Sequence, residues 1–399
     1  MKKNTYNLLV KGIALSLVTS TFLHATNGDS LIAVGTKARG MGGTGIAISH
    51  GAESTLVNPA LITGIEDTEI SFGGILFMPD ITTNFAGAPS YSSDADTSFT
   101  PEVSIAHKLN DNWFIGVGIW GTAGMGTDYS NAPAGANFNM VTNLQLLQFG
   151  VPIAYKANGL SLAVTPILQY GNLDIDYGMP TPGGIQKIGA GLAQDFGFGY
   201  RLGATYDFSS LGVNGLTVGA VYKSEIDMEY THQITTATGP FGLTLSDHLE
   251  QPAEIGVGIA YTMNQHTLAF DYKKVKWSSA KGYGDFGWED QNVYSLGYQF
   301  AQDNWALRAG YNYAKSAVVE VPDHRLNLFN LLGFPATSEQ HYTLGGTYGF
   351  NDKFSLDLAY VYSPASNKTF DISALGMPSP SISTEHKENS VSFQLTYKF

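Results

Sequence analysis

The chain ends in the run Val391-Ser392-Phe393-Gln394-Leu395-Thr396-Tyr397-Lys398-Phe399. Apolar and polar side chains alternate through it without a break. This period of two is the pattern of a β-strand with an apolar face on one side and a polar face on the other. Such a strand is expected between two environments of different polarity.

The same alternation dominates the chain from residue 67 to its end. Residues 354–362 and 303–313 are clear examples, and turn-forming pairs such as Asn158-Gly159 and Asn351-Asp352 separate neighbouring runs. The pattern predicts a meander of antiparallel hairpins. The expected strands lie near 67–79, 99–110, 112–124, 141–157, 159–174, 190–208, 214–231, 244–263, 265–277, 291–300, 303–318, 339–350, 352–366 and 387–399.

Three features favour a transmembrane barrel over a soluble β-sandwich. The strand number is even, and short turns alternate with long loops. Aromatic residues concentrate at strand ends, where the interfacial girdles of barrels lie. A terminal strand that stops on an aromatic residue, here Phe399, resembles the signal that directs bacterial outer-membrane barrels to their insertion machinery. We therefore predict an all-β protein, a 14-stranded antiparallel transmembrane β-barrel, with that machinery, outer-membrane lipid and lipopolysaccharide as partners.

The composition excludes several classes of protein. The chain of 399 residues contains no cysteine, which excludes a disulfide-stapled scaffold and a cysteine-ligated metal site. The formal net charge is -13, and this acidic balance argues against nucleic acid as a partner. Only 14% of the residues are charged, against roughly 25% in an ordinary soluble domain.

Residues 1–25 have the character of a secretory signal peptide. Lys2, Lys3 and Lys11 form a positive region, and the apolar run that follows ends at Ala25, where we place the cleavage site. An uncleaved membrane anchor is the alternative, but the apolar run is shorter than the ~20 residues that a spanning helix requires. Export and a strand meander together predict a multi-pass protein in the outer membrane of a Gram-negative bacterium.

Residues 26–64 are rich in glycine and small residues and lack the period of two. A segment this short does not form an independent domain, whereas the lumen of a 14-stranded barrel is wide enough to need filling. We therefore predict a signal peptide at 1–25, an N-terminal hatch that plugs the barrel at 26–64, and the transmembrane barrel at 65–399. Within the hatch, Asn58 is suited to cap a helix that starts at Pro59.

Several short motifs follow one another in a fixed order. They are Gly40-Met41-Gly42-Gly43-Thr44-Gly45, Asn58-Pro59-Ala60, Gly126-Thr127-Asp128-Tyr129, Asp271-Tyr272 with Trp277, Pro322-Asp323-His324-Arg325, and Phe334-Pro335-Ala336 ahead of His341-Tyr342. In this order the chain resembles the FadL family, outer-membrane transporters of long-chain fatty acids and other hydrophobic compounds. The resemblance covers essentially the whole mature chain. It implies a monomeric passive transporter that is not an enzyme, with a hydrophobic small molecule as cargo: long-chain fatty acids first, aromatic hydrocarbons as the alternative.

The resemblance also implies a route for the cargo. Apolar extracellular loops, one at 124–140 and one that contains residues 326–334, would capture it. A pocket inside the barrel would hold it, and the hatch would shift to release it sideways at a kinked third strand. Glycine weakens a strand ladder and marks bulges, and five glycines lie between residues 116 and 126. The expected hatch residues are Gly42, Gly43, Asn58, Pro59 and Ala60, and the expected lateral opening is at Gly121, Gly124 and Gly126.

Two sets of residues are candidates for binding the cargo. Arg201 and Arg308 are expected to face the lumen, where a planar guanidinium matches a carboxylate; the alternative is that they pair with other charges or hold the hatch. The second set lies in a loop whose exposed leucines and phenylalanines are costly in water unless they bind something. Its members are Leu328, Phe329, Leu332 and Phe334, and the alternative is that these loops cap the barrel and pack on each other.

Signals for other chemistry are weak. The glycines at 40–45 satisfy G-x-G-x-x-G, but no βαβ unit surrounds them. The nine histidines are scattered without metal-binding spacing, so we expect no metal and no cofactor. No G-x-S-x-G motif is present, so we expect no catalytic residues. An outer-membrane hydrolase and a general diffusion porin are the rival functions from other classes.

Overall fold

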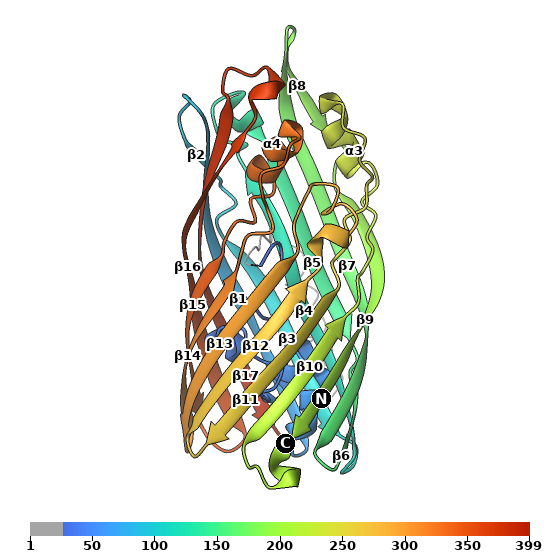
Figure 1. Ribbon diagram of the computed structural model, residues 1–399, viewed down its shortest axis with the longest axis vertical. Coiled ribbons are helices and arrows are strands. Elements are labelled where there is room, and N and C mark those ends of the chain that lie inside the picture. The colour runs from blue at the N-terminus through green and yellow to red at the C-terminus, as the bar shows by residue number, and fades with distance from the viewer. Residues whose placement is uncertain (1–26) are drawn as a thin grey trace, which may run out of the picture.

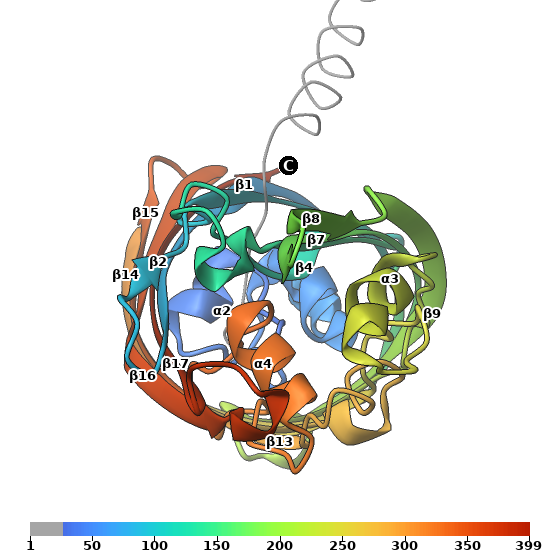
Figure 2. The ribbon, with the colours of Figure 1, turned by 90° about the horizontal axis from the view of Figure 1, so that it is seen from above.

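The structure is a computed structural model that describes residues 27–399, so the predicted signal peptide lies outside the described residues. The chain forms a closed barrel of antiparallel strands, seen from the side in Figure 1 and from above in Figure 2. The first strand, β1 (Thr68–Phe85), pairs from Glu69 onward with the last strand, β17 (Ser381–Lys398). This pairing closes the sheet into a ring.

The wall consists of seventeen strand segments that make fourteen strands. Besides β1 and β17 they are β2 (Tyr91–Ser92), β3 (Ser98–Lys108), β4 (Trp113–Asp128), β5 (Val141–Gly150), β6 (Ile153–Ala157), β7 (Leu160–Thr181), β8 (Gly184–Gly189), β9 (Ala193–Asp207), β10 (Leu216–Lys223), β11 (Glu254–Met263), β12 (His266–Val275), β13 (Gln291–Gln302), β14 (Trp305–Ala314), β15 (Gln340–Gly349) and β16 (Phe354–Asp371). The segments β2 and β3 count as one strand because both pair with β1. The segments β5 and β6 likewise form one strand beside β7, and β8 and β9 form one strand on the other side of β7. The predicted fold class and strand number are confirmed.

The helices are short. They are the α-helices α2 (Thr36–Gly40), α3 (Gln233–Thr238) and α4 (His324–Leu332), and the 3-10 helices η1 (Gly51–Leu56), η2 (Pro59–Gly64), η3 (Ala136–Asn139), η4 (Phe208–Leu211), η5 (Gly239–Phe241), η6 (Trp277–Ser279) and η7 (Ser373–Leu375). Within residues 27–399, no helix has the length and apolar character needed to cross a membrane.

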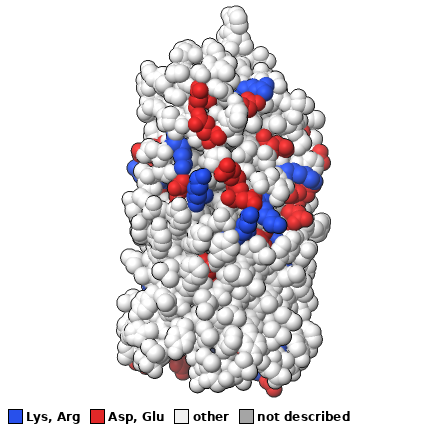
Figure 3. All heavy atoms as spheres, viewed as in Figure 1, with Lys and Arg blue, Asp and Glu red and all other residues white. Residues whose placement is uncertain are grey.

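The two faces of the wall have the polarity that the alternation predicts. Outward side chains such as Leu344 and Leu358 are large, apolar and at least half exposed, whereas the inward Arg308 and Asp357 are buried. Figure 3 shows the consequence: a broad band of the visible face carries almost no Lys, Arg, Asp or Glu, and charges gather above it. This band is the surface that faces lipid.

The two ends of the barrel differ in their connections. At one end the turns are short, and Asn158 and Gly159 both have positive φ, 50° and 83°, as a type I′ hairpin turn requires. The chain terminates at the same end, where the Phe399 amide donates to the Thr68 carbonyl at 3.0 Å. Long loops that carry α3 and α4 cover the other end (Figure 1). Since short turns face the periplasm in bacterial barrels, the end covered by loops is extracellular.

Two strands are shorter than the predicted ranges 214–231 and 244–263. The strand β10 ends at Lys223 and β11 begins at Glu254. Ile226, Met228 and Tyr230 continue the alternation beyond β10, but they are completely buried, and their backbone forms only isolated bridges to residues 248–251. The period of two persists here because apolar side chains pack inside the mouth of the barrel, and not because one face meets lipid.

Residues 27–64, here called the lumenal segment, fold inside the barrel, where Figure 2 shows α2 enclosed by the strands. Asp271 of β12 accepts hydrogen bonds from two consecutive backbone amides of the segment, those of Gly45 and Ile46, at 2.8 and 2.9 Å. In the opposite direction, Arg39 of α2 donates to serine hydroxyls of β17. The polar inner face of the wall thus satisfies the polar groups of the segment.

Asn58 caps the last helix of the lumenal segment. Its side-chain oxygen accepts a hydrogen bond from the Ala60 amide at 3.1 Å, and Pro59 occupies the first helical position. Its amide group donates to the Ile46 carbonyl at 2.7 Å, which ties this helix to the preceding loop. The helix is a 3-10 helix, η2, and Asn58, Pro59 and Ala60 are all buried.

Gly42 and Gly43 lie where the lumenal segment touches the wall most closely. Both have positive φ, 68° and 88°. A Cβ atom at Gly42 would lie 2.6 Å from the backbone nitrogen of Tyr311 in β14, and one at Gly43 would lie 2.7 Å from the Ile32 carbonyl oxygen. Only glycine therefore fits at these two positions without displacing backbone.

We predict that Asn58→Ala loosens the lumenal segment without preventing barrel assembly. Loss of an N-cap costs about 0.5–2 kcal/mol, which corresponds to roughly 2- to 30-fold faster local opening. Hydrogen exchange of residues 44–64 measures this change, and Asn131→Ala in an exposed loop is the matched control. Unchanged exchange in a folded Asn58→Ala barrel would contradict the capping role.

Deletion of Phe399 should reduce outer-membrane accumulation far more than Phe350→Ala. The two rings are similarly exposed, at 60% and 55%, so loss of buried area does not distinguish them. Only Phe399 belongs to the terminal strand that carries the proposed insertion signal. Heat-modifiable barrel in isolated outer membranes is the measurement, and equal yields from both variants would refute the signal.

Candidate functional site

The extracellular half of the barrel is filled by the largest group of buried hydrophobic side chains in the described chain, here called the apolar cluster. It joins residues from the walls β4, β5 and β7 to residues from α4 and from the loop after β12. Barrel lumens are ordinarily polar. An apolar lumen at the extracellular mouth is therefore a candidate site for a hydrophobic ligand.

The helix α4 descends into the mouth of the barrel and carries part of the apolar cluster (Figures 1 and 2). The Asp323 carboxylate accepts a hydrogen bond from the Arg325 amide at 3.0 Å and so caps the helix. The four predicted binding residues of this region lie together in the apolar cluster and are at most 5% exposed; they are Leu328, Phe329, Leu332 and Phe334. The expectation that they are exposed is wrong, because the segment folds into a capped helix whose apolar side chains pack inward.

The predicted capture loop at 124–140 is also mostly enclosed. The strand β4 continues to Asp128, and Phe138 and Met140 are buried in the apolar cluster. The ring of Phe138 makes edge contacts with those of Tyr177 and Phe241, at centroid distances of 6.2 and 6.4 Å. In the described state these loops cap the barrel and pack on each other.

An aromatic group from the loop after β12 forms one wall of the apolar cluster. The rings of Trp277, Tyr283 and Trp288 contact one another at centroid distances of 4.7 to 5.2 Å. A narrow apolar cavity of about 10 Å³ adjoins Tyr283 and Trp288 and is too small for a ligand. The apolar cluster is therefore closed in this state, and a ligand needs α4 or the loops to move. Three large aromatic residues within 277–288, at the end of the predicted strand 265–277 and in the loop after it, were the sequence signal for this wall.

Asp29 connects the apolar cluster to the lumenal segment. Its fully buried carboxylate accepts hydrogen bonds from the Tyr283 hydroxyl, from the Gln251 amide at 2.7 Å and from the Ser30 hydroxyl at 3.0 Å. Burial raises the pKa of Asp29, although these hydrogen bonds act in the opposite direction. The aromatic wall and the lumenal segment thus share one polar contact.

The barrel wall is interrupted between β3 and β4. The ladder between them ends at the pair Glu102 and Trp120. On its other side β4 pairs with β5, and that ladder has a register shift between Gly121 and Ala123. Beyond the last pair, the lumenal segment takes the place of β3: the Leu31 amide donates to the Thr122 carbonyl at 3.3 Å. The predicted third-strand irregularity is thus present at Gly121.

The two other glycines predicted at the opening follow this irregularity. The Gly124 amide donates to the Asp29 carbonyl oxygen at 3.2 Å, so Gly124 also meets the lumenal segment. Gly126 lies opposite Asn143 of β5. The structure therefore brings Gly121 and Gly124 to the interruption and places Gly126 above it in the β4–β5 ladder.

Arg201 and Arg308 lie apart from the apolar cluster, beside the lumenal segment. The Arg201 guanidinium of β9 donates to the Leu56 carbonyl, and its Cζ atom lies 5.8 Å from the centroid of the Trp120 ring. Arg308 of β14 lies 3.6 Å from Asp357 and donates to side chains of Gln299 and Thr347 at 2.7 Å each. In this state the two arginines hold the segment or other lumenal groups, as the alternative interpretation of the sequence proposed.

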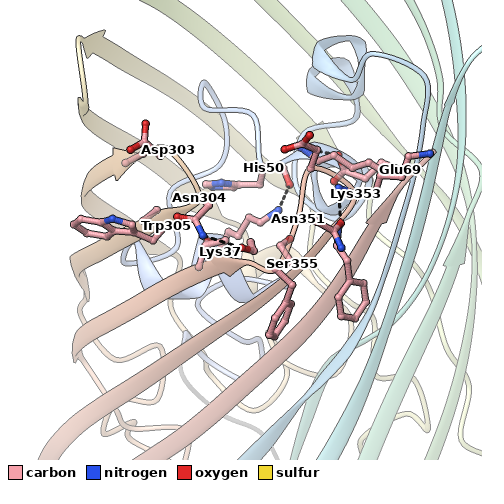
Figure 4. Close-up of a pocket in the computed structure, with 18 of the residues that line it drawn as sticks. Lys37, His50, Glu69, Asp303, Asn304, Trp305, Asn351, Lys353 and Ser355 are labelled. Atoms are coloured by element: carbon pink, nitrogen blue, oxygen red, sulfur yellow. Dashed lines mark hydrogen bonds and ion pairs between the residues drawn. The ribbon is translucent and has the colours of Figure 1, made fainter.

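A cavity of about 490 Å³ with a polar, charged lining lies at the periplasmic end. Figure 4 shows Lys37 and His50 of the lumenal segment, Glu69 of β1, and Asn304 and Lys353 of two periplasmic turns around it. Its size alone does not make it the candidate site, because its charged lining does not suit a hydrophobic ligand. No group of metal-binding side chains occurs in residues 27–399.

Comparison with known proteins agrees with this architecture. The 47 kDa outer membrane protein of Pasteurella multocida is 22% identical, over 81% of this chain and 84% of its own. The long-chain fatty acid transport protein of Escherichia coli O6:H1 is 25% identical, over 79% of this chain and 82% of its own. Outer membrane protein P1 of Haemophilus influenzae is 22% identical, over 87% of this chain and 89% of its own.

Solved structures show the same fold. A Pseudomonas aeruginosa FadL homologue matches with a TM-score of 0.73 and 16% identity, over 93% of this chain and 100% of its own. The Pseudomonas putida toluene transporter TodX matches with a TM-score of 0.69 and 16% identity, over 93% of this chain and 99% of its own. The sequence also matches the family described as "Outer membrane protein transport protein (OMPP1/FadL/TodX)" over residues 25–399, so the chain belongs to this family of outer-membrane transport proteins.

Proposed function

We propose that this protein carries hydrophobic molecules passively across the outer membrane, with long-chain fatty acids as the first class of cargo. The observation that carries the proposal is the apolar cluster inside the extracellular mouth. An alkyl chain that enters this cluster leaves water, and each buried methylene contributes about 0.8 kcal/mol. Family membership supports transport as the activity, and one of the relatives is named as a long-chain fatty acid transport protein.

Aromatic hydrocarbons are the second candidate cargo. The wall formed by Trp277, Tyr283 and Trp288 favours them, because aromatic rings pair edge to face with other rings. The likeness to TodX is a likeness of fold and does not decide between the two cargoes. Mass spectrometry of apolar ligands retained by the gently purified protein tests the choice directly.

The two rival functions predict different behaviour. A general diffusion porin requires an open polar lumen, whereas the lumenal segment of this barrel lies inside the ring of strands (Figure 2); low single-channel conductance is expected. A hydrolase would turn over ester or peptide probes, and we expect no turnover by the purified protein. The protein is proposed to act as a monomer, with the barrel insertion machinery and lipopolysaccharide as further partners.

We propose that the cargo leaves sideways, through the interruption between β3 and β4, after the lumenal segment has shifted. A periplasmic exit would lead an apolar molecule through the polar cavity around Lys37 and Glu69. A lateral exit leads it into lipid instead. At the interruption, β4 is paired with the lumenal segment through Thr122 and Gly124 in place of β3. Movement of the segment would therefore open the wall at this point.

A designed disulfide across the interruption tests the lateral route. A Cβ atom built at Gly121 lies 3.5 Å from the Cβ atom of Thr100, at the short end of the ~3.5–4.5 Å range of disulfides. The chain has no cysteine of its own. We expect oxidised Thr100→Cys/Gly121→Cys protein to lose uptake of oleate almost completely, because the wall is locked, and reduction to restore it.

A disulfide in the intact ladder is the matched control. Val103 and Ile119 are directly opposed below the interruption, so the pair Val103→Cys/Ile119→Cys should transport equally well when oxidised and reduced. If the oxidised Thr100→Cys/Gly121→Cys barrel also transported normally, the lateral route would be wrong. Release past the lumenal segment into the periplasm would then be favoured.

A further inference from the structure

A group of buried titratable side chains lies on the inner wall, outside the apolar cluster. It consists of His341 of β15 with His386 and Glu388 of β17, here called the histidine cluster, and each member is at most 2% exposed. Both imidazoles meet the same carboxylate. Nε2 of His341 lies 3.3 Å from Oε2 of Glu388, and Nε2 of His386 lies 3.2 Å from Oε1. One carboxylate is thus shared by two histidines.

The histidine cluster lies between α4 and the lumenal segment. The buried, inward side chains of this part of β17 are, in order, Thr384, His386, Glu388 and Ser390. The Thr384 hydroxyl donates to the Leu331 carbonyl, in the last turn of α4, at 2.9 Å. The Ser390 hydroxyl accepts a hydrogen bond from the Arg39 guanidinium of α2. The cluster therefore adjoins the end of the helix that closes the apolar cluster.

Several polar atoms around the histidine cluster have no hydrogen-bond partner among the described residues. They include both ring nitrogens of His386 and Nδ1 of His341. The hydroxyls of Thr337 and Ser338, which connect α4 to β15, are also buried and unpaired. Each such group costs about 1–3 kcal/mol. The contact between the wall and the chain after α4 is therefore less stable than a fully paired polar network.

The charges around the histidine cluster supply no second counter-ion. Residues 326–338, which form most of α4 and the turn after it, contain no titratable side chain. Arg39 of the lumenal segment interacts electrostatically with Glu388 and is itself a cation. The other charged side chains nearby pair with each other at 2.9 and 2.7 Å; they are Asp80, which also acts on His386, with Lys387, and Glu339 with Lys368. Protonation of both histidines would therefore bury an uncompensated positive charge.

We propose that the histidine cluster is an acid-sensitive fastening of the barrel mouth: protonation of His341 and His386 releases the end of α4 and opens the apolar cluster. The inference rests on the proposed transport function and adds regulation of that same site. Histidine is the side chain whose charge ordinarily changes between pH 5 and 8. In the open state water solvates both imidazolium groups, so the open state binds more protons than the closed one. The closed state therefore loses stability as the pH falls.

Two buried groups of the lumenal segment do not account for such a response. Burial lowers the pKa of His50 to about 3, so His50 stays neutral at pH 5. Burial raises the pKa of Glu53 to about 7, but its carboxylate accepts hydrogen bonds from the Lys37 and Ala38 amides of α2. Protonation of Glu53 therefore acts on α2, and its effect can be separated from an effect on residues 326–338.

Hydrogen exchange of the native barrel at about pH 5 and about pH 7.5 tests the histidine cluster. After correction for the intrinsic effect of pH on exchange, the amides of residues 326–338 should exchange roughly 10-fold faster at the lower pH. This is the change that one unit of difference in pKa between the closed and open states produces. His341→Gln/His386→Gln should show equal corrected exchange at both pH values. Heat-modifiability verifies folding, and His386→Gln alone decides the matter if the double variant does not fold.

His324→Gln is the matched control. His324 also belongs to α4, but it lies 3.6 Å from a carboxylate of its own, Asp371. This variant should keep the acid response of the native protein.

Entry of an uncharged ligand tests whether the same change opens the mouth. Bromododecanol quenches tryptophan fluorescence, and Trp277 and Trp288 belong to the apolar cluster. Its quenching of the native protein should be faster at the lower pH. In His341→Gln/His386→Gln the rate should be the same at both pH values.

Several results would overturn the inference. Equal corrected exchange of residues 326–338 at both pH values in the native protein would show that no acid-sensitive contact holds α4. A response that persists in folded His341→Gln/His386→Gln, or that is lost in His324→Gln, would place the titrating group elsewhere. A response confined to α2 would assign it to Glu53. If acid releases residues 326–338 but bromododecanol quenches at neither pH, the acid-sensitive contact stands and the proposed function fails.

Discussion

The closed ladder of backbone hydrogen bonds is the constraint on which the rest of this structure depends. In the hydrocarbon region an unpaired N–H or C=O group costs several kcal/mol, so β17 must return to β1. Closing fourteen strands leaves a lumen with many inward positions, and these meet neither lipid nor another strand. The lumenal segment fills the lower part of that space, and wall carboxylates such as Asp271 accept its backbone amides in turn. The closed ladder of the wall therefore requires a second set of hydrogen bonds inside it, between the wall and the lumenal segment.

The interruption between β3 and β4 is the place where the two sets merge. Above Trp120 the backbone of β4 no longer meets β3, and Leu31 and Gly124 supply the hydrogen bonds between β4 and the lumenal segment. The segment is thus part of the wall at this point as well as a plug. It cannot move without breaking hydrogen bonds of β4, and this links the position of the plug to the continuity of the wall. Asp29 extends the link upward, through its contact with Tyr283, to the apolar cluster.

Much of the fold was predictable because the difference between lipid and lumen imposes a period of two on every strand, as at Leu344 and Leu358. The same period appears at Ile226, Met228 and Tyr230, where a core inside the mouth of the barrel causes it, so periodicity alone could not separate the two environments. The sequence suggested binding by the leucines and phenylalanines of 328–334, but the capped helix that buries them depends on tertiary contacts. The approach of Arg201 in β9 to the Trp120 ring in β4 depends on the order and register of the strands in the barrel. The sequence of a single strand does not show its register with the next one.

The inner regions of the barrel differ in polarity along its axis. The apolar cluster lies at the extracellular mouth, the interruption of the wall adjoins it, and the large polar cavity lies at the periplasmic end. Ala123 of the apolar cluster directly follows Thr122, whose carbonyl accepts a hydrogen bond from the lumenal segment. Under the proposed lateral route, a hydrophobic cargo would therefore pass from the apolar cluster to lipid without entering the polar cavity, and the position of the lumenal segment would decide whether that passage is open.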